Sequence, residues 1–353
     1  MSSQTLISVI IPIYNGSPWI NQCFNSILQQ QITPDVNLEV CVCNDASQDD
    51  TKQLLNYWHT VFQQSSIKLK VIDNESGTPY GVLVGYAKNK AISISEGTYL
   101  CFQDVDDIMM PNRISEQYEK AKILPQDTII GCQFKRIPEN STNRYTEWAN
   151  SLPKEKLHIQ IYTSHGPTVI MPTWFCHRKV FNNVGGFSEG GKGTPEDLIF
   201  FYKHLDLGGK VFRVDQCLLT YTYHLNAATF SVQESTIWKL RLQRLELNVL
   251  SNWEKFTIWN AGKQGRRFYH SLSVQHQKKV IAMCDVDVKK VGKAYIPFDP
   301  HTRESGTPVD IVHFKDASPP FVVCVKINLT NGEFEKNLLS LHLTENIDYV
   351  LFS

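Results

Sequence analysis

The sequence lacks a long hydrophobic run and an excess of either charge. No stretch of its 353 residues approaches the roughly 20 apolar residues that a membrane-spanning helix needs. The apolar run at residues 6–13 is too short for the core of a signal peptide followed by a cleavage site. The 35 Lys and Arg residues equal the 35 Asp and Glu residues, so the chain as a whole is neither basic nor acidic. With 42% hydrophobic and 20% charged residues, this composition predicts an ordinary globular protein without a membrane anchor.

The sequence also lacks a paired-cysteine pattern. Its nine cysteines are odd in number, form no Cys-x-x-Cys pair and stand mostly in apolar runs. Disulfide frameworks of secreted proteins use even, regularly spaced cysteines. We therefore expect reduced core thiols and a cytoplasmic or nuclear location.

Charge is unevenly distributed along the chain. Residues 235–293 carry 12 Lys and Arg against 4 Asp and Glu. A basic segment of this kind is typical of contact with a polyanion such as nucleic acid, or of a solvated helical face. The candidates for contacts with phosphate groups are Lys239, Arg241, Arg244, Lys263, Arg266, Arg267, Lys278 and Lys279.

The first hundred residues alternate between apolar runs and segments of helical periodicity. The expected strands cover residues 7–13, 38–43, 69–73 and 99–102, and the expected helices cover 18–30, a segment ending near 64, and 85–95. Polar residues follow the strands. This pattern predicts an open, mostly parallel α/β sheet, in which ligands bind at the carboxyl ends of the strands.

The pattern weakens in the middle of the chain and returns near its end. We expect a helix at 112–124, a strand at 128–134, a polar loop to about 159, strands at 211–214 and 218–224, and an amphipathic helix at 234–256. A length of 353 residues favours two domains, because single cores rarely grow beyond about 250–300 residues. The predicted organisation is a first domain at 1–232, a connecting helix at 233–256 and a Rossmann-like α/β domain at 257–353.

Three carboxylates follow the expected strand at 99–102. Asp104 and Asp106 stand two residues apart, so in extended geometry they share a face and are able to grip one divalent cation. Asp107 and the helix breaker Pro111 come next. The alternative is a solvated turn without a metal ion.

Five segments at the ends of expected elements carry a family resemblance. In order, they are Ser8-Val-Ile-Ile-Pro12-Ile-Tyr14-Asn15, Asn44-Asp45-Ala-Ser47-Gln-Asp49-Asp50-Thr51, Ala87-Lys88-Asn89, Asp104-Val-Asp106-Asp107 and Pro195-Glu196-Asp197. Together they resemble an inverting family 2 glycosyltransferase of the GT-A fold, over about residues 6–230. The third segment has Lys where that family has Arg, which loses a bidentate fork but keeps a cation. The expected fold class is therefore α/β, with a GT-A nucleotide-sugar-binding domain followed by a smaller Rossmann-like domain.

The resemblance implies a role for each matching residue. Binding of a nucleotide sugar is expected from Pro12, Tyr14, Asn15, Asp45, Lys88, Asp104 and Val105. A Mn²⁺ or Mg²⁺ ion is expected on Asp106, Asp104 and His224, where it offsets the charge of the departing diphosphate. Asp197 is the expected general base, and the expected acceptor-binding residues are Trp174, Glu196, Arg266 and Arg267.

Some of these residues have plain structural interpretations as well. Glu196 and Asp197 follow a proline, and acids in the first turn of a helix stabilise its dipole. His224, at a strand end, is either a metal ligand or a structural residue. Trp174 either stacks on a sugar or a base, or packs in the core.

A closer resemblance within the family is to enzymes that move galactose from UDP-galactose to queuosine in the anticodon of tRNA-Tyr. It implies a UDP-sugar donor and a tRNA acceptor. The alternative within the family is a β-1,3-glycosyltransferase that uses UDP-N-acetylglucosamine and acts on a glycan. Outside it, Asn260-x-Gly262-x-x-Gly265 with Asp285 partly matches a dinucleotide fingerprint, as in an oxidoreductase. A non-catalytic sugar-nucleotide binder is a further alternative.

Overall fold

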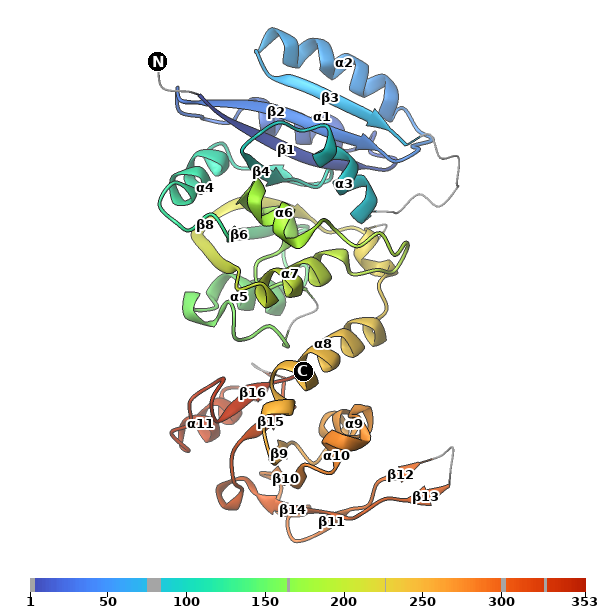
Figure 1. Ribbon diagram of the computed structural model, residues 1–353, viewed down its shortest axis with the longest axis vertical. Helices are drawn as coiled ribbons and strands as arrows, with labels where there is room; N and C mark the ends of the chain where they lie inside the picture. Colours follow the sequence, from blue (N-terminus) through green and yellow to red (C-terminus); the bar gives the residue numbers. More distant parts are fainter. Residues whose placement is uncertain (1–3, 75–83, 164–165, 226, 300–302, 327–328) are drawn as a thin grey trace. The chain divides into compact units, whose positions relative to one another are not determined.

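The computed structural model describes residues 4–74, 84–163, 166–225, 227–299, 303–326 and 329–353. The chain divides into two compact units (Figure 1). Unit 1 comprises Met1–His158 and Gly166–Gln233, and unit 2 comprises Ile159–His165 and Glu234–Ser353. Each unit is described by itself.

Unit 1 is built on a mixed eight-stranded sheet. Its strands are β1 Thr5–Ile13, β2 Val36–Asn44, β3 Lys68–Asp73, β4 Tyr99–Phe102, β5 Ile108–Met109, β6 Thr128–Ile137, β7 Phe175–His177 and β8 Lys210–Thr222. Its α-helices are α1 Ile20–Leu28, α2 Thr51–Gln64, α3 Val84–Ser93, α4 Arg113–Ala121, α5 Asn143–Ser151, α6 Arg178–Val184 and α7 Glu196–Asp206. Short 3₁₀ turns lie at Lys154–Lys156, Met171–Thr173 and Ala228–Ser231.

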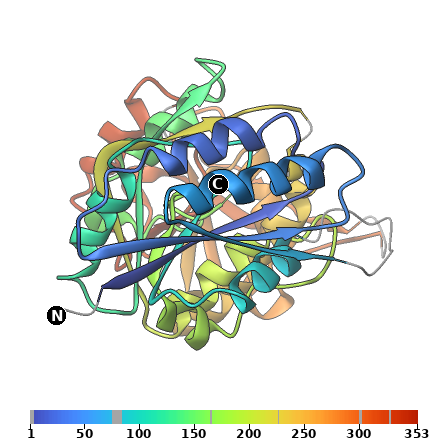
Figure 2. The ribbon, with the colours of Figure 1, turned by 90° about the horizontal axis from the view of Figure 1, so that it is seen from above.

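The strand order in this sheet is β3-β2-β1-β4-β7-β6-β8-β5. Strands β1 to β4 pair in parallel, so their carboxyl ends meet at one edge. Strand β7 joins β4 antiparallel and ends the parallel half. Figure 2 shows α1 and α2 on one face of the parallel half and α3 on the other. This is the arrangement that right-handed crossovers produce when the strand order reverses after β3.

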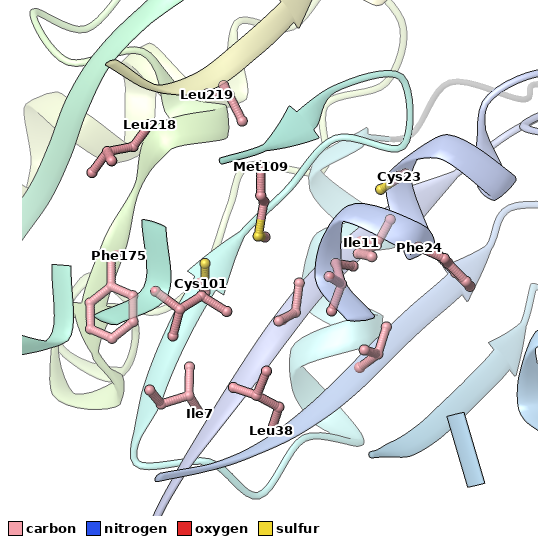
Figure 3. Packing of buried hydrophobic residues seen from close by; sticks show 14 of the residues in the cluster. Ile7, Ile11, Cys23, Phe24, Leu38, Cys101, Met109, Phe175, Leu218 and Leu219 are labelled. Carbon is pink, nitrogen blue, oxygen red and sulfur yellow. The ribbon is translucent and has the colours of Figure 1, made fainter. Parts of the chain in front are cut away.

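Helix α1 shows why the sequence forms these layers. Its buried residues Ile20, Cys23, Phe24 and Ile27 follow the i, i+3, i+4, i+7 spacing of a one-sided helix. They meet side chains from β1, β2, β4, β7 and β8 in one continuous hydrophobic cluster (Figure 3). The cluster holds the sheet rigid beneath the loops that leave its carboxyl edge.

Unit 2 is a smaller α/β unit. Its helices are α8 Glu234–Asn248, α9 Lys263–Ser271, α10 Val274–Gln277 and α11 Glu333–Leu339, with 3₁₀ turns at Leu250–Asn252 and Phe314–Asp316. Its strands are β9 Phe256–Trp259, β10 Val280–Asp285, β11 Ala294–Tyr295, β12 Phe298–Asp299, β13 Glu304–Ser305, β14 Val309–His313, β15 Phe321–Val323 and β16 Tyr349–Leu351. Parallel strands run in the order β14-β10-β9-β15-β16, which is the 3-2-1-4-5 order of a Rossmann-type half.

The structure differs from the sequence expectations in three elements. A single strand, β8, covers the two strands expected at 211–214 and 218–224. Helix α5 occupies part of the expected polar loop; its sequence is polar and only Ala149 is buried, so it has little apolar periodicity to reveal it. Helix α8 ends at Asn248, before the expected end at 256.

The short segment Ile159–His165 belongs to unit 2, although the sequence places it in the first domain. The Tyr162 carbonyl accepts a hydrogen bond from the Ser353 amide (3.3 Å), and the Tyr162 hydroxyl accepts one from Arg244 (3.0 Å). Contacts between residues so far apart in sequence leave no local signal.

None of the helices in the described part of the chain combines the length and the apolar character that a bilayer crossing requires.

Replacing Phe24 with Ala should destabilise unit 1. The side chain is fully buried, and its ring lies 5.6 Å from that of Trp58 and 5.4 Å from that of Phe62. We expect a loss of about 3–5 kcal/mol in the free energy of unfolding, measured by urea denaturation. Phe24→Leu keeps most of the apolar volume and should lose distinctly less. Equal losses for the two variants would contradict this account of the packing.

Candidate active site

Three carboxylates gather in the loop that leaves β4. The Gln103 amide still donates to the Ile10 carbonyl of β1 (3.1 Å), so the loop begins at a fixed point of the sheet. Carboxylate oxygens of Asp104, Asp106 and Asp107 all lie within 4.8 Å of one another. Hard divalent cations such as Mg²⁺ and Mn²⁺ are held by carboxylate oxygens. The loop is therefore a candidate metal centre.

Asp107 is the member of this cluster to which sequence reasoning gave no ligand role. Its side chain is 1% exposed, and its Oδ1 accepts a hydrogen bond from the Thr222 amide (2.8 Å). Its buried Oδ2 has no hydrogen-bond partner within the described residues. Burial, then the charges of Asp106 and Asp104, raise the pKa of Asp107 well above its usual range. A bound cation would give the unpaired Oδ2 a partner and would offset the repulsion among the three carboxylates. The three carboxylates therefore fit a divalent metal. The only sequence signal was a third acid in the run.

A buried arginine fixes the start of the acidic loop. Arg113 is fully buried and donates to the Gln103 side chain (2.7 Å) and to the Phe102 carbonyl (2.8 Å). Gln103 in turn donates to the Asp104 carbonyl (2.9 Å). These bonds hold the backbone from which the carboxylates project. Sequence reasoning missed Arg113, because an arginine that opens an amphipathic helix is normally exposed.

His224 lies beside the acidic loop. Its Nε2 is 2.8 Å from Oδ2 of Asp106, and its ring stacks on Trp19 with centroids 5.1 Å apart. The structure thus brings His224, 118 positions away from Asp106 in sequence, to the two carboxylates with which it was expected to hold the metal. Ligation requires an unprotonated nitrogen, and the stack on Trp19 restricts the orientation of the imidazole ring. Trp19 itself gave no sequence signal of such a role.

Lys88 forms a buried ion pair with Glu196. The side chain of Lys88 is 1% exposed, and its Nζ is 2.8 Å from a carboxylate oxygen of Glu196. Burial alone would lower the pKa of Lys88, but Glu196, Asp104 and Asp197 raise it above its usual value. Helix α3 approaches closely here, because a Cβ on Gly85 would lie 2.1 Å from the Ser188 carbonyl oxygen. The third and fifth segments of the family resemblance therefore meet at one ion pair.

The same cation acts on the acidic loop. Burial raises the pKa of Asp104 to about 7. The positive charge of Lys88 acts in the opposite direction, and the negative charge of Asp106 adds to the rise. Asp104 and Lys88 therefore belong to one electrostatic site rather than to two.

Asp197 stands in the first turn of α7. Its Oδ1 accepts a hydrogen bond from the amide of Leu198 (2.7 Å). Burial and the neighbouring Glu196 raise the pKa of Asp197 to about 6, although Lys88 acts in the opposite direction. A carboxylate whose pKa lies closer to neutrality is a better general base than an ordinary one. The helix-start interpretation is also correct, since both acids lie in the first turn.

The loops after β1 and β2 form a joined wall beside the acidic loop. The amide of Asn15 donates to the Ser47 hydroxyl (2.9 Å), and the Asn15 side chain accepts from the Gln48 amide (2.8 Å). Tyr14 is 41% exposed, and Pro12 precedes it on β1. Asp45 is mostly buried and accepts a hydrogen bond from Asn74 (2.6 Å). Asn74 is a further residue that the sequence did not indicate.

Val105 links this wall to the acidic loop. A Cβ on Gly16 would lie 3.4 Å from a methyl group of Val105 and 2.6 Å from one of Ile13. The chain therefore needs glycine at 16 for the two loops to pack. Apart from Lys88 in α3, the residues expected to bind the nucleotide sugar thus stand at or just after the ends of β1, β2 and β4, which are neighbouring strands.

The acceptor-binding role expected of Trp174 is wrong. Its side chain is 0% exposed, and its indole nitrogen donates to the Val169 carbonyl (2.8 Å). Rings of Phe102, Phe187 and Phe200 pack around it. A fully enclosed indole has no free face for a sugar.

Arg266 and Arg267 belong to unit 2, where both have protein partners. Arg266 donates to the Ala261 carbonyl (3.0 Å) and lies over the ring of Tyr295. Arg267 lies 3.9 Å above the ring of Trp238 and forms an ion pair with Glu234 at 2.7 Å.

Among the other basic candidates, Arg241 is only 3% exposed and bonds to the Ser353 carbonyl (2.7 Å), so it cannot meet a phosphate at the surface. Lys279 is partly buried and donates to the Leu250 carbonyl (2.7 Å). The remaining exposed members of the set are Lys239, Lys263, Arg266 and Lys278.

The glycine turn after β9 is filled by its own side chains. The Asn260 side chain accepts a hydrogen bond from the Gly262 amide (2.7 Å), at the start of α9 where a pyrophosphate would bind. Asp285 accepts from the Ala261 amide (3.0 Å) and pairs with Lys290 at 2.9 Å. A Cβ on Gly265 would lie 1.8 Å from the Asn260 carbonyl oxygen, so this glycine serves close helix–strand packing.

Comparison with known proteins places these residues in a family. The model of glycosyl transferase family 2 matches residues 8–185. An uncharacterized glycosyltransferase of Rickettsia conorii is 30% identical over 259 residues, which cover 71% of this chain and 38% of the relative. The chondroitin synthase of Pasteurella multocida is 31% identical over 364 residues, which cover 98% of this chain and 34% of the relative. The chain thus spans about a third of the length of these two relatives.

A solved structure supports the fold. TarS 1–349 of S. aureus, in complex with UDP-GlcNAc, superimposes with a TM-score of 0.52 at 16% identity, covering 78% of this chain and 84% of that one. Together with the family match, this similarity confirms the GT-A-like α/β fold expected from the sequence.

Replacing Asp107 with Asn should separate metal binding from stability. We expect at least about a tenfold loss of Mn²⁺ affinity by calorimetry, because a charged ligand is lost. The metal-free variant should nevertheless unfold at a higher temperature at neutral pH. The reason is that the pKa of Asp107 is raised in the folded protein, so its ionised carboxylate destabilises the fold at neutral pH. The uncharged Asn side chain removes this destabilisation.

The exposed Glu119→Gln, a matched loss of charge on α4, should change neither quantity. Unchanged Mn²⁺ affinity in Asp107→Asn would remove Asp107 from the donor set.

Proposed function

The chain belongs to glycosyl transferase family 2, and we propose that it transfers a hexose from a UDP-sugar to a hydroxyl group with inversion. The main support for this proposal is that one buried cation, Lys88, interacts with both the acidic loop and the Glu196–Asp197 pair. Transfer of a sugar needs the acidic loop and the Glu196–Asp197 pair side by side. The acidic loop would face the departing diphosphate, and the Glu196–Asp197 pair would face the incoming hydroxyl.

The donor half of the site is assigned to the loops at the sheet edge. We assign the nucleotide to Pro12, Tyr14, Asn15 and Asp45, and the diphosphate to Lys88 and the acidic loop. A Mn²⁺ or Mg²⁺ ion, when bound by Asp104, Asp106, Asp107 and His224, would neutralise charge on the leaving UDP. Lys88 supplies a fixed positive charge that attracts Asp104 and pairs with Glu196.

The acceptor half of the site is assigned to α7. Asp197 takes the proton of the acceptor hydroxyl, whose oxygen forms a bond to the anomeric carbon as the bond from that carbon to UDP breaks. A single displacement of this kind inverts the configuration and needs one base. We assign to Glu196, which pairs with Lys88, the role of accepting a hydrogen bond from the acceptor.

We propose galactose from UDP-galactose as the donor group and queuosine of tRNA-Tyr as the acceptor. The support is the closer sequence resemblance and the basic segment 235–293, to which Arg266 and other exposed cations of unit 2 belong. Cytoplasmic action fits nine free cysteines. A transferase that uses UDP-GlcNAc on a glycan is the second candidate, favoured by the similarity to a chondroitin synthase and to TarS solved with UDP-GlcNAc.

An oxidoreductase is the weaker alternative. Asn260 and Asp285, which would meet the pyrophosphate and the ribose of a dinucleotide, are bonded within unit 2. A mere sugar-nucleotide binder would not need a carboxylate such as Asp197, whose pKa of about 6 suits proton transfer.

Substrate assays separate these candidates. The purified chain with Mn²⁺ is incubated with UDP-galactose or UDP-GlcNAc, and with tRNA-Tyr that carries queuosine or guanosine. We expect UDP release and galactose incorporation only with UDP-galactose and the queuosine-bearing tRNA. Incorporation from UDP-GlcNAc into a glycan instead would favour the second candidate, and binding of NAD(H) without UDP-sugar turnover would favour the oxidoreductase.

Asp197→Asn should lower kcat by about 10²–10⁴, the range typical of a lost general base, while affinity for the UDP-sugar is retained. In the wild type, kcat/KM should fall as the pH drops through about 6, because the protonated carboxyl group cannot accept the hydroxyl proton. Asp206→Asn, at the exposed end of the same helix, should leave kcat and the affinity for the UDP-sugar unchanged. If donor affinity falls with kcat in Asp197→Asn, the residue is structural.

A further inference from the structure

Arg136, near the end of β6, lies within a cage of aromatic rings. Its guanidinium carbon is 4.4 Å from the ring centre of Tyr221 and 5.5–5.7 Å from those of Tyr145, Tyr223 and Phe134. The rings come from β6, α5, β8 and the residue after β8. Aromatic faces attract a cation and hold a planar guanidinium in one orientation.

The charge of Arg136 has no anionic partner in the described part of the chain. Its Nε is enclosed without a hydrogen-bond partner there, and no carboxylate of the described residues lies within ion-pair distance of Arg136. Arg136 is half-buried. Two buried cations of unit 1 have carboxylate partners: Lys88 pairs with Glu196, and Arg213 pairs with Asp215. Partial burial of an unpaired cation carries a desolvation cost, and aromatic rings offset only part of it. The guanidinium is oriented and still lacks an anion.

The cage adjoins the candidate active site. Arg136 stands opposite Tyr221 in the pairing of β6 with β8. The next residue of β8, Thr222, is the one whose amide holds Asp107, and His224 follows two positions later. Burial, then the nearby charges of Asp107 and Asp104, raise the pKa of Tyr221. The cage is therefore a neighbour of the acidic loop on the β8 side of the sheet.

The surface next to the cage is apolar and aromatic. Tyr223 meets Phe230 edge to face, with centroids 5.6 Å apart, and Phe230 is 52% exposed. Leu225 is 83% exposed, and Ile137, directly after Arg136, is 45% exposed. Exposed aromatic faces beside an oriented arginine are typical of surfaces that bind unstacked bases and the backbone of RNA.

We propose that Arg136 binds a phosphate group of the acceptor RNA, next to the nucleotide that receives the sugar. This inference rests on the proposed tRNA acceptor and adds to it a contact within unit 1. A guanidinium offers paired N–H donors that match two oxygens of one phosphate. Because the donor diphosphate is assigned to Lys88 and the acidic loop, the caged cation is available for the acceptor.

The test compares tRNA binding by Arg136→Met, Arg136→Lys and Lys135→Met. Lys135 is the matched control: it is exposed, adjacent on β6, and points to the other face of the strand. Binding of queuosine-bearing tRNA-Tyr is measured by fluorescence anisotropy over a series of salt concentrations. Binding of UDP with Mn²⁺ and the melting temperature show that each variant is folded.

Arg136→Met should weaken tRNA binding about 10- to 100-fold, as expected for loss of a charge-assisted contact. The slope of log K against log salt should become shallower by roughly one unit. Arg136→Lys should keep the slope and lose part of the affinity, and Lys135→Met should bind like the wild type.

Two failures are distinguishable. If the wild type transfers galactose to tRNA but Arg136→Met binds tRNA with the same affinity and salt slope as Lys135→Met, the phosphate site is wrong and the proposed function stands. If the wild type neither binds tRNA nor transfers a sugar to it, the proposed acceptor is wrong and the phosphate site is overturned with it.

Discussion

The charge balance around Lys88 is the interaction on which the candidate active site depends. This almost fully buried cation pairs with Glu196 and attracts Asp104 and Asp197, so it is the common counter-charge of carboxylates from two distant parts of the chain. Removing one partner of a buried pair typically costs about 3–5 kcal/mol, because the other charge remains enclosed. The donor and base halves of the site are therefore not independent, and the pKa values of Asp104 and Asp197 are set jointly.

Hydrogen bonds and close backbone packing keep these charges in place. Arg113 and Gln103 hold the backbone from which the acidic loop leaves β4, and the Thr222 amide fixes Asp107. Gly16 and Gly85 permit close approaches that any side chain would block. A site whose dipoles and charges are positioned before the substrate arrives avoids the cost of reorganisation during the reaction. The rigid parallel half of the sheet supplies that positioning.

Much of unit 1 was predictable from local patterns. The parallel strands and α1 carry apolar runs or helical periodicity strong enough to identify them, and the acidic loop stands where a buried strand ends. Helix α5 was not predictable in this way, because its residues are polar and only Ala149 is buried. Trp174 was ambiguous for a different reason: an aromatic residue looks the same in sequence whether it faces a ligand or is enclosed by Phe102, Phe187 and Phe200.

The sequence by itself determined the fold class, the order of the motifs and the kinds of side chain at the site, because periodicity and residue chemistry are local properties. Only the tertiary structure decided which charges meet. The pairing of Lys88 with Glu196 spans 108 positions, and that of His224 with Asp106 spans 118. It also decided that Arg241 is buried and that Arg136 is caged by aromatic rings. Burial and counter-charge are set by residues distant in sequence, so no local pattern records them.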